Sequence, residues 1–412
     1  MPEPGETRST GELGLVSRRM TLKAGLGLAA GAALVGTAGS GIAHAGKDRL
    51  ARANARKVGR FTGPDLTGKF GAHFVDLCIP VQLADGSLLF IGGDTYGAGT
   101  PAPSPEHPKG DDWRGPTGLR SHSDAAAGPV VIDGAVSDRP GHAKGLVPED
   151  HVGKPGGPYT TALPSDVFRV GDTLYMHLMR GPIYDTHHTD FWKSTDNGET
   201  WTYLRQWPRE LFGFQFQQKT YAADTGDDPY VYVMSTVFNR YRDSGLLLFR
   251  VLKSDLDKTD KDAAESGWGP KYAYQGWGNA NGQWAWGNEP TSITETRFWG
   301  EICFRAMGGK YALSWFQPNN DHNLEDIRAQ VFPLPTSDLF QGTEQTMVYA
   351  SGSNPASDPE SVQGNPYGGF IFPGSTFENF QIAVSNWNPQ APYDTNENYV
   401  VSQWRTRLDP GI

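Results

Sequence analysis

Short apolar runs joined by polar turns recur along the chain from about residue 74 onward. The clearest pair, at 74–83 and 87–96, is joined by Ala84-Asp85-Gly86. Asp-Gly between apolar runs is a strong signal for a β-hairpin. Helical periodicity over ten or more residues is scarce outside the amino-terminal segment. The pattern therefore predicts an all-β protein. Further strand pairs are predicted at 161–179, 219–236, 299–317 and 368–385.

The number and spacing of these pairs favour a β-propeller. Roughly 350 residues divided into units of about 70 give five blades of four strands, within the usual propeller range. The segment Ser194-x-Asp196-x-Gly198-x-x-Trp201 resembles the Asp box, a structural hairpin motif of sialidase-type and other propellers. We therefore predict a five-bladed β-propeller and assign the Asp box no catalytic role. A large jelly roll or β-sandwich is the alternative fold.

The turn of the first hairpin decides where two acidic residues lie. If Gly86 takes the left-handed position of a three-residue loop, Leu83 faces Ser87 and, farther from the turn, Asp76 faces Asp94. Directly opposed β-carbons are roughly 4.5–5.5 Å apart, so the two carboxylates would repel each other. A shared proton or a functional demand explains why such a pair is kept. A two-residue loop would shift the register and place the aspartates on opposite faces.

Composition narrows the class of protein. The 412 residues include 51 Gly, 30 Pro and 12 Trp, and 12% of the residues are aromatic. This mixture fits many short strands, tight turns and aromatic-lined clefts. Because the net charge is −10, we do not expect the protein to bind nucleic acid. The two cysteines, Cys78 and Cys303, lie in apolar segments and are expected to be buried free thiols, although a disulfide is open from sequence.

The first 45 residues have the features of an export signal. Ser17-Arg18-Arg19-Met20-Thr21-Leu22-Lys23 resembles a twin-arginine motif, a weakly apolar run follows, and Ala43-His44-Ala45 fits a cleavage site. We therefore expect a protein exported by the twin-arginine route, secreted or associated with the cell wall, with no membrane segment after cleavage. The predicted organisation is a signal peptide at 1–45, a linker at 46–65 and the catalytic propeller at 66–412.

Two carboxylates flanking a sugar–oxygen bond are the usual apparatus of glycoside hydrolysis. One stays ionised as nucleophile or base, and the other, with a raised pKa, donates a proton to the leaving oxygen. Asp76 and Asp94 are the predicted catalytic residues, and which of them has which role is open. The predicted substrate-binding residues are Tyr96, Arg114, His122, Asp166, Trp284, Trp286 and Glu301. No cofactor is expected and no Cys/His spacing indicates a metal site, although propeller channels often carry a cation.

Several motifs resemble one known family. They are Asp76-Leu77-x-Ile79-Pro80-Val81, Gly93-Asp94-Thr95-Tyr96, Asp112-Trp113-Arg114-Gly115-Pro116, Gly300-Glu301-Ile302-Cys303-Phe304-Arg305, Tyr367-Gly368-Gly369-Phe370-Ile371-Phe372-Pro373-Gly374-Ser375 and Ser385-Asn386-Trp387-Asn388-Pro389. In this order they are similar to the DUF4185-type proteins, which include the endo-D-arabinanases of glycoside hydrolase family 183. The resemblance runs from about residue 66 to 405. The sequence departs from the family pattern at Gly115-Pro116-Thr117, where a serine is expected before the proline, and in the long loop after Ala98.

The resemblance implies a five-bladed propeller and endo-hydrolysis of D-arabinofuranosyl linkages in cell-wall arabinan, in arabinogalactan and lipoarabinomannan. The two essential aspartates of the family fall on Asp76 and Asp94, the pair that the hairpin argument selects. The alternatives are a non-catalytic glycan-binding propeller attached to the wall and a sialidase-like exo-enzyme. The exo-enzyme needs three converging arginines, and the arginine spacing singles out no such set. Oligomeric state, linkage preference and stereochemical course stay open from sequence.

Overall fold

The computed structural model describes residues 50–98, 112–148, 160–266, 273–318, 325–351, 359–388 and 398–410. All of these residues belong to one compact unit, Asp48–Ile412. The predicted signal peptide lies outside the described residues. Within the described part of the chain, no helix is both long enough and apolar enough to span a bilayer.

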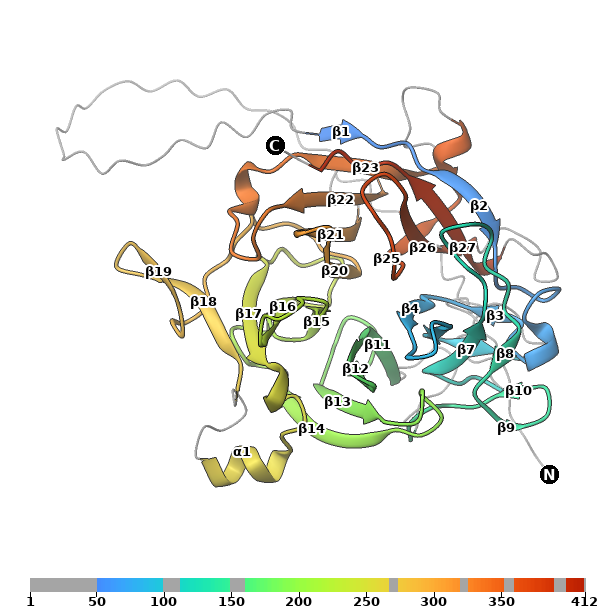
Figure 1. Cartoon of the computed structure of the whole chain (residues 1–412), viewed down its shortest axis with the longest axis horizontal. Coiled ribbons are helices and arrows are strands. Elements are labelled where there is room, and N and C mark those ends of the chain that lie inside the picture. Colours follow the sequence, from blue (N-terminus) through green and yellow to red (C-terminus); the bar gives the residue numbers. More distant parts are fainter. Residues whose placement is uncertain are drawn as a thin grey trace, which may run out of the picture. The chain divides into compact units, whose positions relative to one another are not determined.

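Five mainly antiparallel sheets arranged around an axis form a five-bladed β-propeller, as the sequence predicts (Figure 1). Blade 1 contains β4 (Ile79–Gln82), β5 (Leu88–Gly92), β7 (Thr117–Ser121) and β8 (Gly134–Ala135). Blade 2 contains β11 (Thr161–Val170), β12 (Thr173–Gly181), β13 (His188–Ser194) and β14 (Thr202–Pro208). Blade 3 contains β15 (Gln218–Ala222), β16 (Tyr230–Thr236), β17 (Leu247–Leu252), β18 (Gln275–Ala280) and β19 (Gln283–Trp286).

The last two blades each include a strand from the beginning of the fold. Blade 4 contains β20 (Ile302–Met307), β21 (Lys310–Gln317), β22 (Asp326–Phe332) and β23 (Glu344–Ala350), with β1 (Leu50–Arg52) and β24 (Val362–Gln363) at its edge. Blade 5 contains β25 (Pro366–Ile371), β26 (Phe380–Trp387), β27 (Tyr399–Thr406) and β2 (Arg56–Arg60). Outside the blades lie β3 (Phe74–Val75), β6 (Thr95–Tyr96), β9 (Ser137–Arg139), β10 (His142–Ala143) and the helix α1 (Asp260–Ser266).

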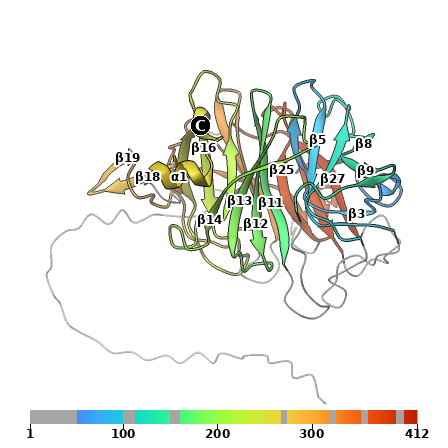
Figure 2. The same ribbon diagram turned by 90° about the horizontal axis from the view of Figure 1, so that it is seen from below.

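The innermost strands β4, β11, β15, β20 and β25 contact one another in sequence, and β25 contacts β4 to complete the ring (Figure 1). Figure 2 shows the blades from the side, with the β18–β19 hairpin at the outer edge. The carboxyl ends of four of these strands, at Gln82, Val170, Met307 and Ile371, line one cavity of about 490 Å³. Their amino ends therefore lie at the other mouth of the channel. Asp76 and Glu301, just before β4 and β20, belong to that second mouth.

The linker predicted at 46–65 is wrong for residues 50–60. β1 pairs in parallel with β23, and β2 pairs antiparallel with β27, with Arg56 opposite Arg405. A strand at the outer edge of a blade is held by backbone hydrogen bonds and needs few apolar side chains. This segment is basic and has few large apolar residues, so its composition predicts a linker. In the structure it closes the ring.

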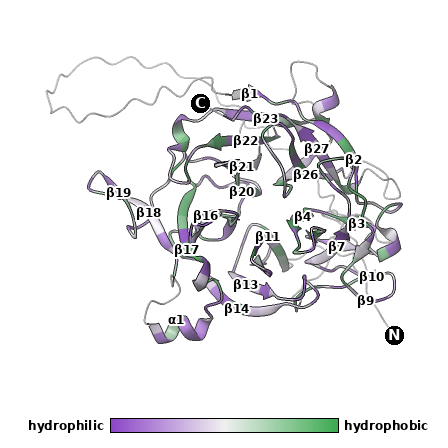
Figure 3. Ribbon diagram, viewed as in Figure 1, coloured by the Kyte–Doolittle hydropathy of each residue, from purple (hydrophilic) through white to green (hydrophobic). Residues whose placement is uncertain are grey.

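The core lies between adjacent blades, where strands such as β17 carry mostly hydrophobic residues (Figure 3). The two cysteines are buried free thiols, as expected. The Asp box is also confirmed as structural, because Oγ of Ser194 accepts from N of Gly198 at 2.9 Å and Nε1 of Trp201 donates to O of Gly198 at 3.1 Å.

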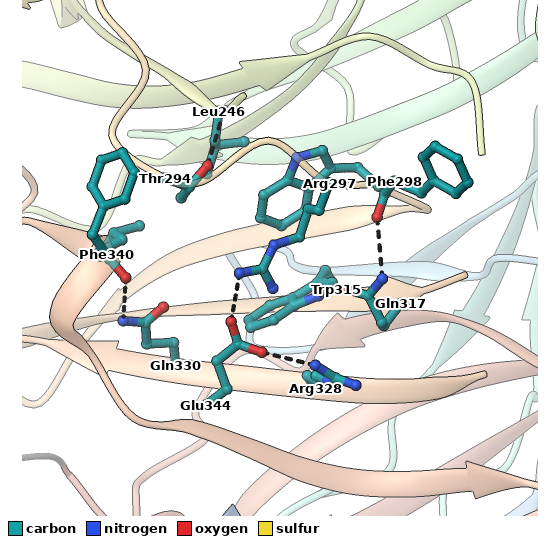
Figure 4. A network of polar contacts seen from close by, with 12 residues as sticks. Leu246, Thr294, Arg297, Phe298, Trp315, Gln317, Arg328, Gln330, Phe340 and Glu344 are labelled. Atoms are coloured by element: carbon teal, nitrogen blue, oxygen red, sulfur yellow. Dashed lines mark hydrogen bonds and ion pairs between the residues drawn. The ribbon is translucent and has the colours of Figure 1, made fainter. Parts of the chain in front are cut away.

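A partly buried ion cluster ties the connection before β20 to blade 4 (Figure 4). The carboxylate of Glu344 binds Arg297 at 2.7 Å and Arg328 at 2.9 Å. Burial raises the pKa of Glu344, but the guanidinium groups of Arg297 and Arg328 outweigh burial and hold the pKa below its usual value of 4.5. The cluster therefore stays ionised and contributes to stability at neutral pH.

Candidate active site

The first hairpin has the register that the sequence predicts. Gly86 has a φ of +88°, and N of Leu83 donates to O of Ser87 at 2.8 Å. Farther from the turn, Ile79 pairs with Ile91 and Val75 pairs with Thr95. Asp76 follows Val75 and Asp94 precedes Thr95, so the two aspartates are opposite each other. N of Asp76 donates to O of Asp94 at 3.3 Å.

The strand that carries Asp76 is bent directly after this residue. Leu77 and Cys78 have positive φ angles of 58° and 49°, which non-glycine residues rarely adopt. Ser385 on β26 stabilises the bend, because its Oγ accepts from N of Leu77 at 2.8 Å. A β-carbon on Gly93 would clash with Oδ1 of Asp76. The local backbone is therefore shaped around this carboxyl group, and strained backbone of this kind is typical of functional sites.

The carboxyl group of Asp76 is buried, and the residue is 6% exposed. Burial raises its pKa well above the usual 3.8, and the charge of Asp94 raises it further. Hydrogen bonds from Tyr399 and Tyr367 act in the opposite direction with less effect, and the hydroxyl of Tyr367 donates to Oδ2 at 3.1 Å. Asp76 is therefore the member of the pair that is suited to hold a proton.

Asp94 is half-buried and accepts side-chain hydrogen bonds. Nε1 of Trp113 donates to Oδ1 of Asp94 at 2.9 Å, and Oγ1 of Thr161 donates to the same oxygen at 3.2 Å. Donors to a carboxylate stabilise its charge. Thr161 begins the inner strand of blade 2, so Asp94 lies where blades 1 and 2 meet.

Glu301 lies at the same mouth and is bound on both oxygens. Its Oε1 pairs with Nη2 of Arg240, and its Oε2 accepts from N of Gly368 at 3.2 Å. The guanidinium of Arg240 lies 5.2 Å from the ring centroid of Tyr367, the tyrosine that binds Asp76. The charge of Glu301 also contributes to the raised pKa of Asp76. Glu301 thus acts on the pair electrostatically and through Tyr367.

Tyr96 and Arg114, two predicted substrate-binding residues, lie beside the pair but are buried. Tyr96 is parallel to Trp113, with ring centroids 6.2 Å apart and an interplanar angle of 8°. Arg114 pairs with Asp112 and donates from Nη2 to O of Gly71 at 2.8 Å. Both residues therefore support the walls of the site, and Arg114 points to Asp112 and Gly71 instead of the aspartate pair.

The structure does not bring Asp166 or His122 to the pair. Asp166 is fully buried and binds Arg305 at 2.6 Å, so it links the inner strands of blades 2 and 4. His122 follows Ser121, which pairs with Leu88 at the turn end of blade 1. Both expectations were wrong in placement. The antiparallel β7 carries His122 away from Asp94, and Asp166 lies farther along β11 than Thr161, which contacts Asp94.

The two predicted tryptophans are also elsewhere. Trp284 and Trp286 lie on the β18–β19 hairpin, which projects from the outer side of blade 3 (Figure 1). A hairpin on the outermost strands of a blade cannot reach the channel. The expectation that these rings line the same cleft as the aspartates is therefore wrong.

Sequence reasoning missed several residues that contact the pair or its partners. Trp113 and Tyr367 lie in motifs quoted above, so the family pattern held a signal for them. Thr161, Arg240 and Tyr399 stand in no recognised motif, and only the fold shows their position. Among the described residues, no group of three or more His, Cys, Asp or Glu could hold a metal ion.

Comparison with known proteins places this site in a family. The sequence profile described as "Domain of unknown function (DUF4185)" matches residues 62–405. The chain belongs to the DUF4185 family. An uncharacterized 35.9 kDa protein from Mycolicibacterium smegmatis is 26% identical over 342 residues, covering 78% of this chain and 89% of that protein.

Two solved structures are similar to this DUF4185 chain. A protein from Bacteroides ovatus, described as a candidate hydrolase, has a TM-score of 0.52 and 12% identity, covering 82% of this chain and 86% of its own. The α-L-arabinofuranosidase of Podospora anserina has a TM-score of 0.47 and 12% identity, covering 88% and 99%. At this identity the Bacteroides structure supports the fold alone.

Proposed function

We propose that this DUF4185 protein is a secreted glycoside hydrolase that cuts internal D-arabinofuranosyl linkages of cell-wall arabinan. The observation that carries the proposal is the opposed pair of Asp76 and Asp94 at one mouth of the propeller. One carboxyl group is buried with a raised pKa, and the other is half-buried and accepts hydrogen bonds from Trp113 and Thr161. Glycoside hydrolysis needs two carboxyl groups in different protonation states.

The environments of the two aspartates suggest their roles. Asp76 donates its proton to the glycosidic oxygen as the bond from that oxygen to the anomeric carbon breaks. Asp94 forms a bond to the anomeric carbon, and a water molecule then displaces it while Asp76 takes the proton of that water. Directly opposed residues favour the short carboxyl separation of about 5 Å that belongs to retaining enzymes. NMR of the first product would show retention, and inversion would exclude the covalent step.

The resemblance to the endo-D-arabinanases of family 183 supports the choice of substrate. It rests on Asp76, Asp94 and the motifs that contain Glu301 and Tyr367. These four residues lie at the same mouth. The amino-terminal motif at Arg18-Arg19 supports export by the twin-arginine route. Replacing both arginines by lysine is expected to keep the protein inside the cell, as fractionation would show.

Hydrolysis is tested with the mature protein and purified arabinogalactan. Soluble oligosaccharides are expected from the wild type, and Asp76→Asn and Asp94→Asn are expected to lose at least about 10³-fold in rate with folding intact. The exposed Asp172→Asn serves as the control and should keep full activity. Binding without release, unchanged by either substitution at the pair, would support the non-catalytic alternative. A monosaccharide as first product would support exo-action.

A further inference from the structure

The β18–β19 hairpin carries three tryptophans on one face. Trp277 pairs with Trp286, and Asn279 pairs with Trp284. Because side chains alternate along a strand, these four residues share a face. The rings of Trp277 and Trp284 are stacked with centroids 6.0 Å apart and an angle of 24°. Trp284 is 41% exposed. Exposing an indole ring to water is unfavourable, and an exposed apolar patch commonly marks a binding site.

The rest of the hairpin holds this face in place. Arg250 lies 4.6 Å from the ring centroid of Trp286, which is itself 5.8 Å from that of Tyr232 in blade 3. On the opposite face, a β-carbon on Gly278 would clash with the carbonyl oxygen of Glu289, so the segment after the hairpin covers that side. The tryptophan face is therefore a preorganised surface, and preorganisation reduces the entropy lost on binding.

The charge of the hairpin indicates the kind of ligand. Residues 275–287 contain no charged side chain, whereas 20% of the whole chain is charged. A hairpin that carries aromatic rings and no charged residue of its own is complementary to a neutral polymer, and sugar rings stack on indole faces. A membrane fits less well, because Asn279, Asn281 and Gln283 are exposed at the tip and would lose their hydration in lipid. The hairpin also lacks the basic residues that attract anionic lipids.

We propose that Trp277 and Trp284, supported by Trp286, form a second binding site for a neutral polysaccharide chain, remote from Asp76 and Asp94. The proposal extends the proposed function, since this site would hold the polymer while the aspartates cut it. Such a second contact raises the effective concentration of polymer at the active site and leaves the rate on short fragments unchanged.

The binding test uses the hydrolysis-deficient mature protein Asp94→Asn, run in native gels that contain arabinogalactan. Adding Trp284→Ala, or Trp277→Ala with Trp284→Ala, is expected to weaken retardation by about tenfold in apparent Kd. Adding Leu334→Ala, at an apolar residue that is 60% exposed in blade 4, is the matched control and should change nothing. Equal retardation of the tryptophan variants and their parent would overturn the proposal.

Two further measurements separate the possible outcomes. In the active protein, Trp284→Ala should slow release from the polymer and leave the rate on a short arabinofuranoside unchanged; an equal loss on both would overturn the proposal. Cosedimentation with neutral phosphatidylcholine vesicles that Trp284→Ala abolishes would assign the hairpin to a membrane instead. Retardation does not depend on hydrolysis, so an inactive wild type would refute the proposed function without affecting the result for the hairpin.

Discussion

The indole of Trp113 both binds Asp94 and packs on Tyr96. Its Nε1 donates to Oδ1 of the carboxylate at 2.9 Å, and its ring lies parallel to that of Tyr96 at 6.2 Å. Tyr96 in turn makes an edge contact with Tyr399 at 6.1 Å. Because Tyr399 acts on Asp76 through a hydrogen bond, one run of aromatic side chains connects the surroundings of both aspartates.

Trp113→Phe keeps the stacking and removes the donor. A hydrogen bond to a charged group contributes about 1.5–3 kcal/mol, so kcat/KM on arabinan should fall roughly 10- to 100-fold. The acidic limb of the pH–rate profile should move to higher pH, because a carboxylate that loses a donor binds its proton more tightly. Trp201→Phe removes an equivalent indole donor in the Asp box and should not alter the profile. An unchanged profile for Trp113→Phe would argue against this role.

Asp76→Asn should make the protein more stable at neutral pH while abolishing hydrolysis. The pKa of Asp76 is raised in the folded state, so between 3.8 and that raised value the folded protein binds more protons than the unfolded chain. The free energy of unfolding of the wild type therefore falls as the pH rises through this window. The amide of the substituted side chain does not titrate, so the free energy of unfolding of the variant does not fall through this pH window.

We expect the variant to gain on the order of 1–3 kcal/mol at pH 7, and the gain to shrink as the pH approaches 3.8. Urea denaturation at several pH values measures both quantities. Asp172→Asn, at an exposed position, is the control and should show no gain. A loss of stability at pH 7 in Asp76→Asn would show that burial and the charge of Asp94 do not destabilise the carboxylate.

Glu344→Gln should destabilise blade 4. The side chain lies between Arg297 and Arg328, and the variant removes its charge from both, although Arg328 keeps its ion pair with Asp326 (Figure 4). We expect a loss of about 2 kcal/mol in the free energy of unfolding at pH 7. Because the folded pKa of Glu344 is lowered, this contribution is present above 4.5 and is lost as the pH falls through the folded pKa.

The pH dependence makes this prediction specific. The deficit of Glu344→Gln should shrink below pH 4.5 in urea titrations, and a deficit independent of pH would point to packing instead of charge. The matched control is Glu360→Gln, because Glu360 pairs with Arg56 while its side chain is 72% exposed. Exposed pairs contribute about 0–1 kcal/mol, so this variant should be near wild type.

A chain that begins at Thr62 should fold poorly, although the family profile also begins there. It lacks β1 and β2, and so leaves edges of β23 and β27 unpaired. We expect the melting temperature to fall by about 10 °C or more, with aggregation through the open edges. A chain that begins at Asp48 is the control. Equal melting temperatures would show that the ring closes without these strands.

The sequence predicts the parts of the fold that depend on local pattern. The turn at Gly86 and the alternation beside it are sufficient to place Asp76 opposite Asp94. The apolar strand pairs are sufficient to indicate five blades. What fails depends on pairing between distant segments: β2 has little apolar character, and only its pairing with β27 shows that it belongs to the fold.

The candidate site shows the same division. Trp113 and Arg114 stand in one motif, but the motif does not tell which of them meets the pair, and the structure turns Arg114 towards Asp112 and Gly71. The residue type of Trp284 suggests a sugar contact, whereas the position of its hairpin in blade 3 is not readable from sequence. Side chains such as Tyr399 reach the site from other blades, which no local pattern shows.

The antiparallel pairing of β2 with β27 has a consequence for synthesis of the protein. β2 is made before blades 1 to 3, whereas its partner β27 is made after them. Blades 1 to 3 have all their strands beforehand, but the circle stays open until β27 has been made. Completion of the ring thus requires that synthesis has passed β27, and a product terminated before this strand would expose an unpaired β2 to proteases and chaperones.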